Sequence, residues 1–499
     1  MRKFLILLAV LLANLYSYSQ DFSNKGTDFW VAYGYHQVMT GGNGQDMVLY
    51  FATETATNVT VQIPGIGYSV TYAVPANTVF TSNVIPKAAP QDARLMAESV
   101  VGENKGIHIT SDQPIVAYAH IYNASVSGAT ILFPTNTLGR EYYSINFENF
   151  SNTFDANCWA YVIAADTGTT TVEITPSAAT LTKPAGVPFT VTLTQGQVFN
   201  IMGQYTNNVG PGGQGGSGVD LTGTLIRSMN TGSGCKKIAV FSGSGRINIA
   251  CNVGNNSTSS DNYMVQAFPK NAWGKRFLTA TAGGNQGFNY FRICVSDPTA
   301  NVLLNGAPIG LPLQNGFYYQ VGPTDQPLRI DADKPITVAQ YFTSQSRCGN
   351  GGLGDPEVIY LSPVEQNINK VLFNSNLLVA AGTKNHYANV IIPNGGTAVS
   401  SFRIDGAVPA TPFTVHPQNP SYSYIKISGL AQGQHTMQSD SGFNAIAYGF
   451  ASAESYGYNA GTNVIDLFQY LSIQNAYAIV NSPVACKSSP FIMSITLPY

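Results

Sequence analysis

One stretch of the sequence, SDQPIVAYAHIY at Ser111–Tyr122, recurs along the chain and constrains the fold more than any other feature. It is echoed by ADKPITVAQYF at Ala332, by SDSGFNAIAYGF at Ser439 and, more weakly, by GCKKIAVFSG at Gly234. Such internal self-similarity is the sequence signature of a repeat architecture. The chain therefore holds four diverged copies of one unit.

Other segments recur in step with this stretch. The first three copies along the chain are each followed by a Pro-containing connection that leads to Gly or Asn and another strand: FPTNTLGREYYS at Phe133, FPKNAWGKRFLT at Phe268 and LSPVEQNINKVLF at Leu361. Between these markers, apolar residues alternate over short runs that are separated by turn residues, which indicates half-buried antiparallel strands. No long amphipathic helical pattern interrupts them.

The predicted fold is therefore all-β, a tandem array of four antiparallel β-sandwich-like modules packed against each other. The alternative is one closed, propeller-like ring of four enlarged blades. The division that we expect is a signal peptide at 1–19, β modules at 20–138, 139–273, 274–368 and 369–467, and a segment at 468–499 that begins a truncated Ig-like module or forms a C-terminal tail.

Charge and hydropathy narrow the choice of partner. Charged residues make up 10% of the 499 residues and the formal net charge is -2, without a long run of either sign. Nucleic-acid binding through counterion release needs a clustered basic face, so we expect no nucleic-acid partner. Beyond the N-terminus, no apolar run is long enough for a membrane span.

The N-terminus resembles an export signal. Arg2 and Lys3 precede the apolar run FLILLAVLLANLY, and small residues lead to a cleavage site before Gln20. This pattern predicts a secreted or cell-surface protein in a compartment that permits disulfides. We expect Cys235 to pair with Cys251 and Cys294 to pair with Cys348.

Two reactive side chains of the repeated stretch have structural explanations. Asp112 aligns with Asp333 and Asp440, and an aspartate followed two residues later by Pro or Gly is typical of a turn that precedes a strand. The column of His120 holds Gly, Tyr and Tyr in the other copies (Gly243, Tyr341 and Tyr448). We therefore interpret Asp112 as a turn former and His120 as a variable strand-surface residue.

No pattern of residues indicates catalysis, a metal or a cofactor. Asp355 and Glu357 in GDPEVIY resemble a glycosidase pair only in residue type, because no aromatic sugar platform lies nearby in sequence. The glycine-rich runs at Gly210 and Gly349 do not precede helices, so they are not phosphate loops. The histidines are scattered without metal-ligand spacing, and the pair Asp331 and Asp333 is a weak calcium signal.

Aromatic residues are the remaining resource for binding. The chain has 28 tyrosines and 25 phenylalanines, and two aromatic segments lie near the ends of the repeat array. On a rigid β scaffold such side chains form recognition surfaces at low entropic cost. The candidate binding-face residues are Trp30, Tyr33, Tyr35, Tyr456 and Tyr458.

The segments that carry a family resemblance are GTDFWVAY, the Ser111 and Phe133 segments, GCKKIAVFSGSGR and DPEVIYLSPVEQNI. Through them the chain resembles the immunoglobulin G Fc-binding protein N-terminal domain family over Gly26–Leu467. Members of this family occur in a mucus-associated animal protein and in secreted, multidomain bacterial surface proteins. The resemblance implies an extracellular binding or adhesion module. It supplies no residue motif for binding immunoglobulin Fc.

The expected function is non-enzymatic recognition of an extracellular glycoprotein, mucin or glycan. One alternative is a carbohydrate-active hydrolase on a β scaffold, and another is a structural stalk or matrix component. A hydrolase needs a pocket in which two carboxylates, or an acid and a histidine, converge.

Overall fold

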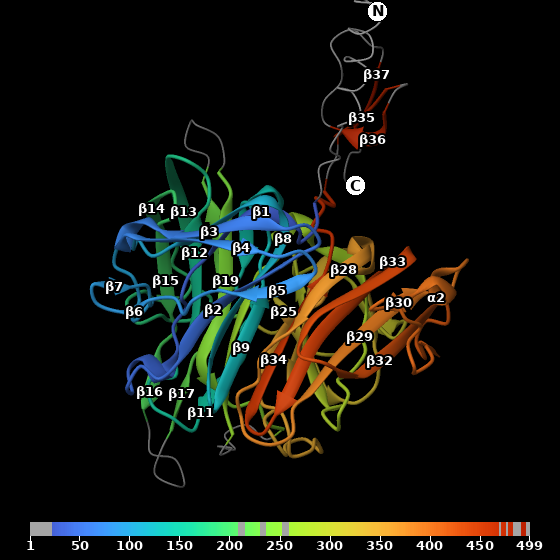
Figure 1. The fold of residues 1–499 in the computed structure, drawn as a ribbon. Helices are drawn as coiled ribbons and strands as arrows, with labels where there is room; N and C mark the ends of the chain where they lie inside the picture. Colours follow the sequence, from blue (N-terminus) through green and yellow to red (C-terminus); the bar gives the residue numbers. More distant parts are fainter. Residues whose placement is uncertain are drawn as a thin grey trace, which may run out of the picture.

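In the computed structural model, the described residues are 22–207, 215–229, 236–251, 259–468, 471–475, 478–482 and 491–495, the last three ranges without their side chains. Apart from a single-turn helix and short 3-10 helices, these residues form antiparallel strands and loops (Figure 1). The helical turns are η1 (Gln37–Met39), η2 (Pro64–Ile66), η3 (Thr135–Thr137), η4 (Lys270–Ala272), η5 (Val364–Gln366) and α2 (Ala398–Ser401). The predicted all-β, multi-module class is confirmed.

The first unit consists of two sheets that are joined by one long strand, β8 (Ile107–Asn123). The first half of β8 pairs with β1 (Gly26–Val31) and β3 (Thr57–Ile63), and its second half pairs with β2 (Asp46–Thr53) and β9 (Val126–Ile131). The outer strands are β4 (Tyr68–Val74) and β5 (Thr78–Thr81). Alternate residues of β3 are buried, so the two sheets enclose a core between them.

The same topology recurs three times. In the second unit the long strand is replaced by two consecutive strands, β18 and β19, each belonging to one sheet. The second unit contains β10 (Glu141–Tyr143), β12 (Cys158–Ala164), β13 (Thr169–Thr175), β14 (Phe189–Thr194), β15 (Val198–Met202), β18 (Leu225–Ser228), β19 (Ile238–Ile247) and β20 (Asp261–Gln266). The third contains β21 (Gly274–Leu278), β22 (Asn289–Val295), β23 (Val302–Leu304), β24 (Ala307–Pro308), β25 (Tyr318–Thr324), β26 (Arg329–Phe342) and β27 (Glu357–Tyr360). The fourth contains β28 (Ile368–Ser375), β29 (Asn385–Pro393), β30 (Arg403–Ile404), β31 (Thr414–Val415), β32 (Tyr422–Leu430), β33 (Gly433–Ala451) and β34 (Glu454–Gly461).

Two small sheets decorate the first and second units. They are formed by β6 (Lys87–Ala88) with β7 (Gln91–Asp92), and by β11 (Asn149–Ser151), β16 (Tyr205–Asn207) and β17 (Gly216–Gly218). A separate sheet of β35 (Leu471–Asn475), β36 (Ala478–Ser482) and β37 (Phe491–Ile495) lies apart from the four units (Figure 1). Among the described residues, no helix has the length and apolar character needed to cross a membrane.

The repeated aspartates lie on a bulge in the long strand, not in a turn. The pairing register shifts where β1 meets β8, and it shifts at the equivalent places where β21 meets β26 and β28 meets β33. Asp112 accepts a hydrogen bond from the Asn58 side chain (3.0 Å), and Asp333 accepts one from the backbone N–H of Asn301 (2.8 Å). The prediction of a turn was wrong because the strand continues through the bulge. The bulge leaves backbone groups unpaired, and Asp112 and Asp333 form hydrogen bonds there with the neighbouring segments.

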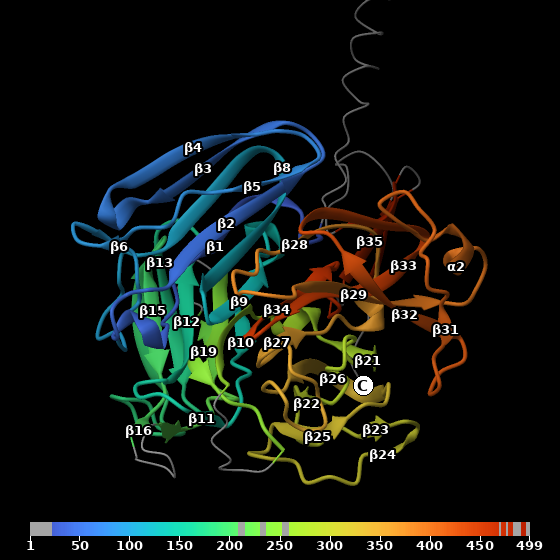
Figure 2. The same ribbon diagram turned by 60° about the horizontal axis from the view of Figure 1, so that its bottom comes forward.

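The four units close into a ring. The last strand of each unit faces the centre: β9 contacts β20 and β34, and β27 contacts the same two strands. In Figure 2 the four colour groups follow one another around a centre at which β9, β27 and β34 lie. The modules of two sheets that the sequence predicts are thus packed against each other in a closed cycle.

The two ends of the ring are joined by backbone pairing. The Asn24 N–H donates to the Thr462 carbonyl (3.1 Å), and the Val464 N–H donates to the Phe22 carbonyl (2.6 Å). The Asn24 side chain also accepts a hydrogen bond from the Thr462 N–H. The chain therefore enters and leaves the ring at adjacent points.

Candidate binding site

Short connections that contain proline link successive units. In the first, the Thr137 N–H donates to the Pro134 carbonyl, and in the second the Ala272 N–H donates to the Pro269 carbonyl, both at 2.9 Å. Proline fixes its own φ near the value that this turn needs, so the two connections adopt the same shape. They place 136–141 and Lys270–Asn271 beside the point where the chain leaves the ring.

A pocket of about 640 Å³ lies at this point. Its lining consists of Phe22, 136–141, Lys237, Lys270–Asn271, 464–466 and Phe468, and we call it the terminal pocket. The Leu467 N–H donates to the Asn271 carbonyl (2.8 Å), which holds the C-terminal wall against the second connection. The volume lies within the range that is typical of small-molecule sites.

Cations and apolar side chains share the lining of the terminal pocket. Lys270 forms an ion pair with Glu141 at 2.6 Å, and its ammonium group lies 5.7 Å from the ring centre of Tyr143. Arg140 is exposed, and its guanidinium has no hydrogen bond or ion pair with the residues that the structure describes. Arg140 is therefore a free cation at the pocket wall.

Lys237 is held in place by backbone carbonyls. Its Nζ donates to the carbonyl oxygens of Thr135 (3.2 Å) and Asn136 (2.9 Å). Burial lowers the pKa of Lys237, a nearby Asp166 carboxylate opposes this, and the positive charge of Arg140 adds to the lowering. Arg140 and Lys237 thus lie close enough to repel each other across the pocket wall.

A second polar cluster lies at the centre of the ring and is closed to solvent. The Asp261 carboxylate, at the start of β20, accepts hydrogen bonds from the N–H groups of Ser127 on β9 (2.6 Å) and Ser455 on β34 (3.2 Å). Glu357, at the start of β27, accepts one from the Gly457 N–H on β34 (3.2 Å). These carboxyl groups connect inner strands that do not pair with one another in a sheet.

Asp355 and Glu357 do not form a glycosidase pair. Burial raises the pKa of Asp355 to about 7 and raises the pKa of Glu357 well above its ordinary range. Both side chains are fully buried, whereas a hydrolase needs an ionised carboxylate that the substrate can reach. Glu357 accepts from the backbone N–H groups of Val358 and Gly457, and Asp355 accepts from the Ser259 hydroxyl.

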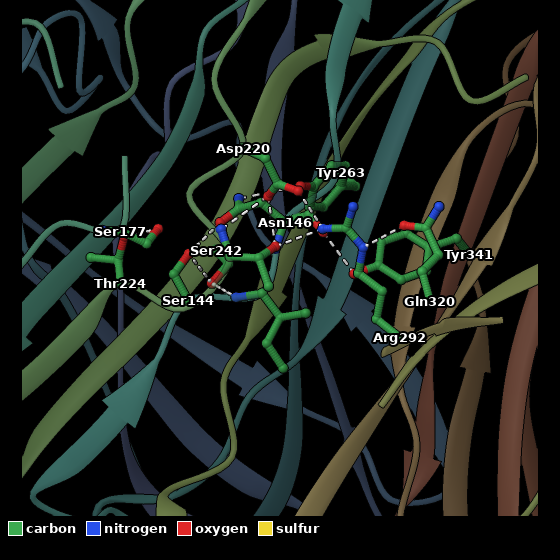
Figure 3. A network of polar contacts seen from close by, with 12 residues as sticks. Ser144, Asn146, Ser177, Asp220, Thr224, Ser242, Tyr263, Arg292, Gln320 and Tyr341 are labelled. Atoms are coloured by element: carbon green, nitrogen blue, oxygen red, sulfur yellow. Dashed lines mark hydrogen bonds and ion pairs between the residues drawn. The ribbon is translucent and has the colours of Figure 1, made fainter. Parts of the chain in front are cut away.

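A third cluster joins the second unit to the third (Figure 3). Arg292 on β22 is 2% exposed, and its Nη1 donates to the Asn146 carbonyl (2.9 Å), Thr222 Oγ1 (2.7 Å) and Asp220 Oδ2 (2.5 Å). The guanidinium also lies 4.3 Å from the ring centre of Tyr318. Burial disfavours its charge, but the Asp220 carboxylate outweighs this and raises the Arg292 pKa. The cluster is an internal connection between the second and third units.

His120 is not on the strand surface. It is fully buried, with Nδ1 2.9 Å from the Tyr50 hydroxyl and Nε2 2.8 Å from Ser127 Oγ. Burial lowers the pKa of His120 to about 3, so the imidazole is neutral. Its aligned residues are also buried: Gly243, Tyr341 and Tyr448. The prediction failed because this part of the long strand has a neighbour on both faces.

The five candidate binding-face aromatics are interior residues. Their exposed fractions, in the order Trp30, Tyr33, Tyr35, Tyr456 and Tyr458, are 3%, 0%, 2%, 0% and 3%. They cannot form an exposed face, because neighbouring units cover them. Residues of the second unit lie against Trp30 and Tyr35, and Tyr458 packs on Tyr118 of the first unit with ring centres 5.1 Å apart.

One disulfide lies among the described residues, and it differs from the expected pairs. Cys251 pairs with Cys348, with Cα atoms 5.4 Å apart, while Cys294 is a free, buried cysteine like Cys158. The expected pairs, Cys235–Cys251 and Cys294–Cys348, were wrong because the ring brings equivalent loops of the second and third units together. Cys235 itself lies outside the described residues, as does Cys486.

Sequence reasoning missed the terminal pocket. Arg140 follows the first glycine of the second unit, and Lys270 lies in the next connection, so a cation near each connection was a signal within the repeat. Formation of the terminal pocket also requires the segment 464–468 to pack against these connections, and no local sequence pattern indicates that contact. Within the described part of the chain, no group of three or more His, Cys, Asp and Glu side chains could hold a metal ion.

The chain is similar in sequence to a family of known proteins. The family model described as IgGFc binding protein matches residues 128–449. The match begins in β9 and ends in β33, so it takes in the connections, the second and third units and most of the fourth. A search of curated proteins found no match.

Proposed function

The chain belongs to the IgGFc binding protein family, and from this premise we propose that it is an extracellular, non-enzymatic binding protein whose ligand is a glycoprotein, mucin or glycan. The observation that carries the proposal is the family match over 128–449. The N-terminal pattern of charge, apolar run and small residues supports export by a signal peptide at 1–19.

The architecture suits a binding role. Four modules, for which we propose the boundaries 20–138, 139–273, 274–368 and 369–467, form a ring held by buried polar clusters and a disulfide between units. A scaffold that is fixed before binding loses little conformational entropy when a ligand docks. The terminal pocket offers such a ligand a preformed recess with apolar and charged walls.

Immunoglobulin Fc is one partner to test, because the family name refers to it. The purified secreted chain, without residues 1–19, is applied to arrays of glycans, mucins and immunoglobulin Fc. Saturable binding to at least one class is expected. Absence of binding to all three classes by a protein with a cooperative unfolding transition would refute the proposal and favour a stalk or matrix component.

A further inference from the structure

We propose that the terminal pocket binds an acidic saccharide, with its carboxylate or sulfate group on Arg140 and Lys237. This inference rests on the proposed function, since it assigns a ligand class and a location to the binding that the family predicts. No comparison or sequence motif assigns a ligand to this pocket. The argument depends on three features of its lining: a free cation, hydrogen-bond acceptors and an apolar wall.

The first feature is positive charge without an ion-pair partner among the described residues. Lys270 is neutralised by Glu141 at 2.6 Å, but Arg140 has no ion pair with any described residue. The Lys237 ammonium donates only to backbone carbonyls, and it is the backbone N–H of Lys237 that donates to the Asp166 carboxylate (2.7 Å). The guanidinium fork matches a carboxylate or sulfate with two parallel hydrogen bonds. A bound anion would also relieve the repulsion between Arg140 and Lys237.

The second feature is an acceptor beside the cations. Asp466 lines the same pocket, and one of its carboxylate oxygens accepts a hydrogen bond from the Phe468 N–H (2.8 Å). A ligand that consists of negative charge alone, such as inorganic phosphate, would be repelled by Asp466. A saccharide has hydroxyl groups that can donate to Asp466 while its acidic group binds Arg140. An acidic saccharide therefore complements both the negative and the positive side chains of the pocket.

The third feature is an apolar wall. Phe22 and Ile465 are exposed by 36% and 40%, and both line the pocket together with Leu138 and Phe468. Large exposed apolar side chains around a recess mark a binding surface. The C–H face of a sugar ring would cover them, whereas a fully hydrated ion would leave them in water. The pocket of about 640 Å³ is compact enough to hold a terminal sugar and not an extended peptide.

The test is calorimetric titration of the full secreted chain with four small probes. They are the methyl glycoside of N-acetylneuraminic acid, its uncharged methyl ester, galactose 6-sulfate and galactose. We expect binding of the carboxylate probe, the sulfate probe or both, and which of them binds identifies the acidic group. The neutral counterpart should bind at least about tenfold more weakly, as expected for loss of a charged hydrogen bond.

Variants locate the site. Arg140→Gln should weaken binding of the acidic probe at least about tenfold, and Arg140→Lys should restore part of it because the charge remains. Lys384→Gln, an exposed lysine in the fourth unit, is the matched control and should bind like the unmodified chain. Thermal unfolding of each variant checks that the ring is intact.

Two results would overturn the inference. One is equal affinity for the acidic probe and its neutral counterpart, and the other is unchanged affinity in Arg140→Gln. If arrays show binding to mucin or immunoglobulin Fc that Arg140→Gln does not alter, the proposed function stands and the acidic-saccharide pocket is refuted. If the arrays are negative but the acidic probe binds and Arg140→Gln abolishes it, the pocket stands and glycoprotein recognition fails.

Discussion

Gly139 lies directly against Pro269: a Cβ atom on Gly139 would stand 2.4 Å from the Pro269 Cβ. The same relationship joins Gly26 to Pro134 and Gly274 to Pro363, with 2.3 Å in both cases. In each of the first three units, a glycine at the start of the first strand, or two residues before it in the second unit, lies against the proline of the connection that ends the unit. This contact lets the closing connection cross the start of its own unit.

Gly139→Ala should therefore destabilise the ring. No real Cβ atom tolerates such a contact, so the connection must shift, and overpacking of this kind costs about 1–3 kcal/mol. Denaturant unfolding followed by tryptophan fluorescence measures the change. Gly395→Ala is the control, because no atom lies within 4 Å of its added Cβ, and equal stability of the two variants would contradict the prediction.

Arg292→Met should reduce stability more strongly than a typical surface change. It leaves the Asp220 carboxylate, which is part of a buried network, without its counterion, and breaking a buried pair in this way costs about 3–5 kcal/mol. Adding Asp220→Asn to the Arg292→Met variant removes the orphaned charge and should recover part of the loss. A double-mutant cycle in chemical denaturation checks this, and strictly additive losses would show that the two groups do not interact.

Mass spectrometry of the unreduced, proteolysed protein should find Cys251 linked to Cys348, with Cys158 and Cys294 as free thiols. The linked residues are 97 positions apart. A cross-link over a loop of this length stabilises a fold by about 2–4 kcal/mol through the unfolded state. Cys251→Ser should lower the unfolding temperature accordingly, and a Cys251–Cys235 peptide would contradict the assignment.

The contribution of Asp355 to the free energy of unfolding should fall as pH rises from about 4 to about 7. Burial raises the pKa of Asp355 from its ordinary value of 3.8 to about 7, so in this interval the folded chain holds a proton that the unfolded chain has released. Linkage then makes the folded state less stable as pH increases. The raised pKa values of Asp261 and Glu357 act in the same direction, whereas the pKa values of His36 and His120, which burial lowers, act in the opposite direction.

Asp355→Asn should remove this contribution and make the slope of unfolding free energy against pH more positive, because the amide does not titrate. Unfolding curves at a series of pH values between 4 and 8 give the slope for each protein. Asp325→Asn, which removes an exposed carboxylate, is the control and should keep the slope of the unmodified chain. An unchanged slope in Asp355→Asn would show that Asp355 does not contribute to the pH dependence.

The sequence alone determined the number of units and their strand content. The recurrence of the Ser111 stretch, the alternation of apolar residues and the Pro-containing connections are local patterns, and local patterns follow from the two-residue period of a strand and the fixed φ of proline. Even the Gly139–Pro269 contact repeats at positions that the alignment of units had already paired. These features survive divergence because each unit must form the same pair of sheets.

The tertiary structure determines which residues of different units contact one another. Packing between units buries Trp30 and Tyr458, pairs Cys251 with Cys348 and brings Arg292 to Asp220, and each of these contacts joins residues from different units. It also creates the terminal pocket from segments at both ends of the chain. Strand periodicity states which face of a strand is apolar but not which neighbour covers it. That choice depends on the packing of whole modules, which no local pattern encodes.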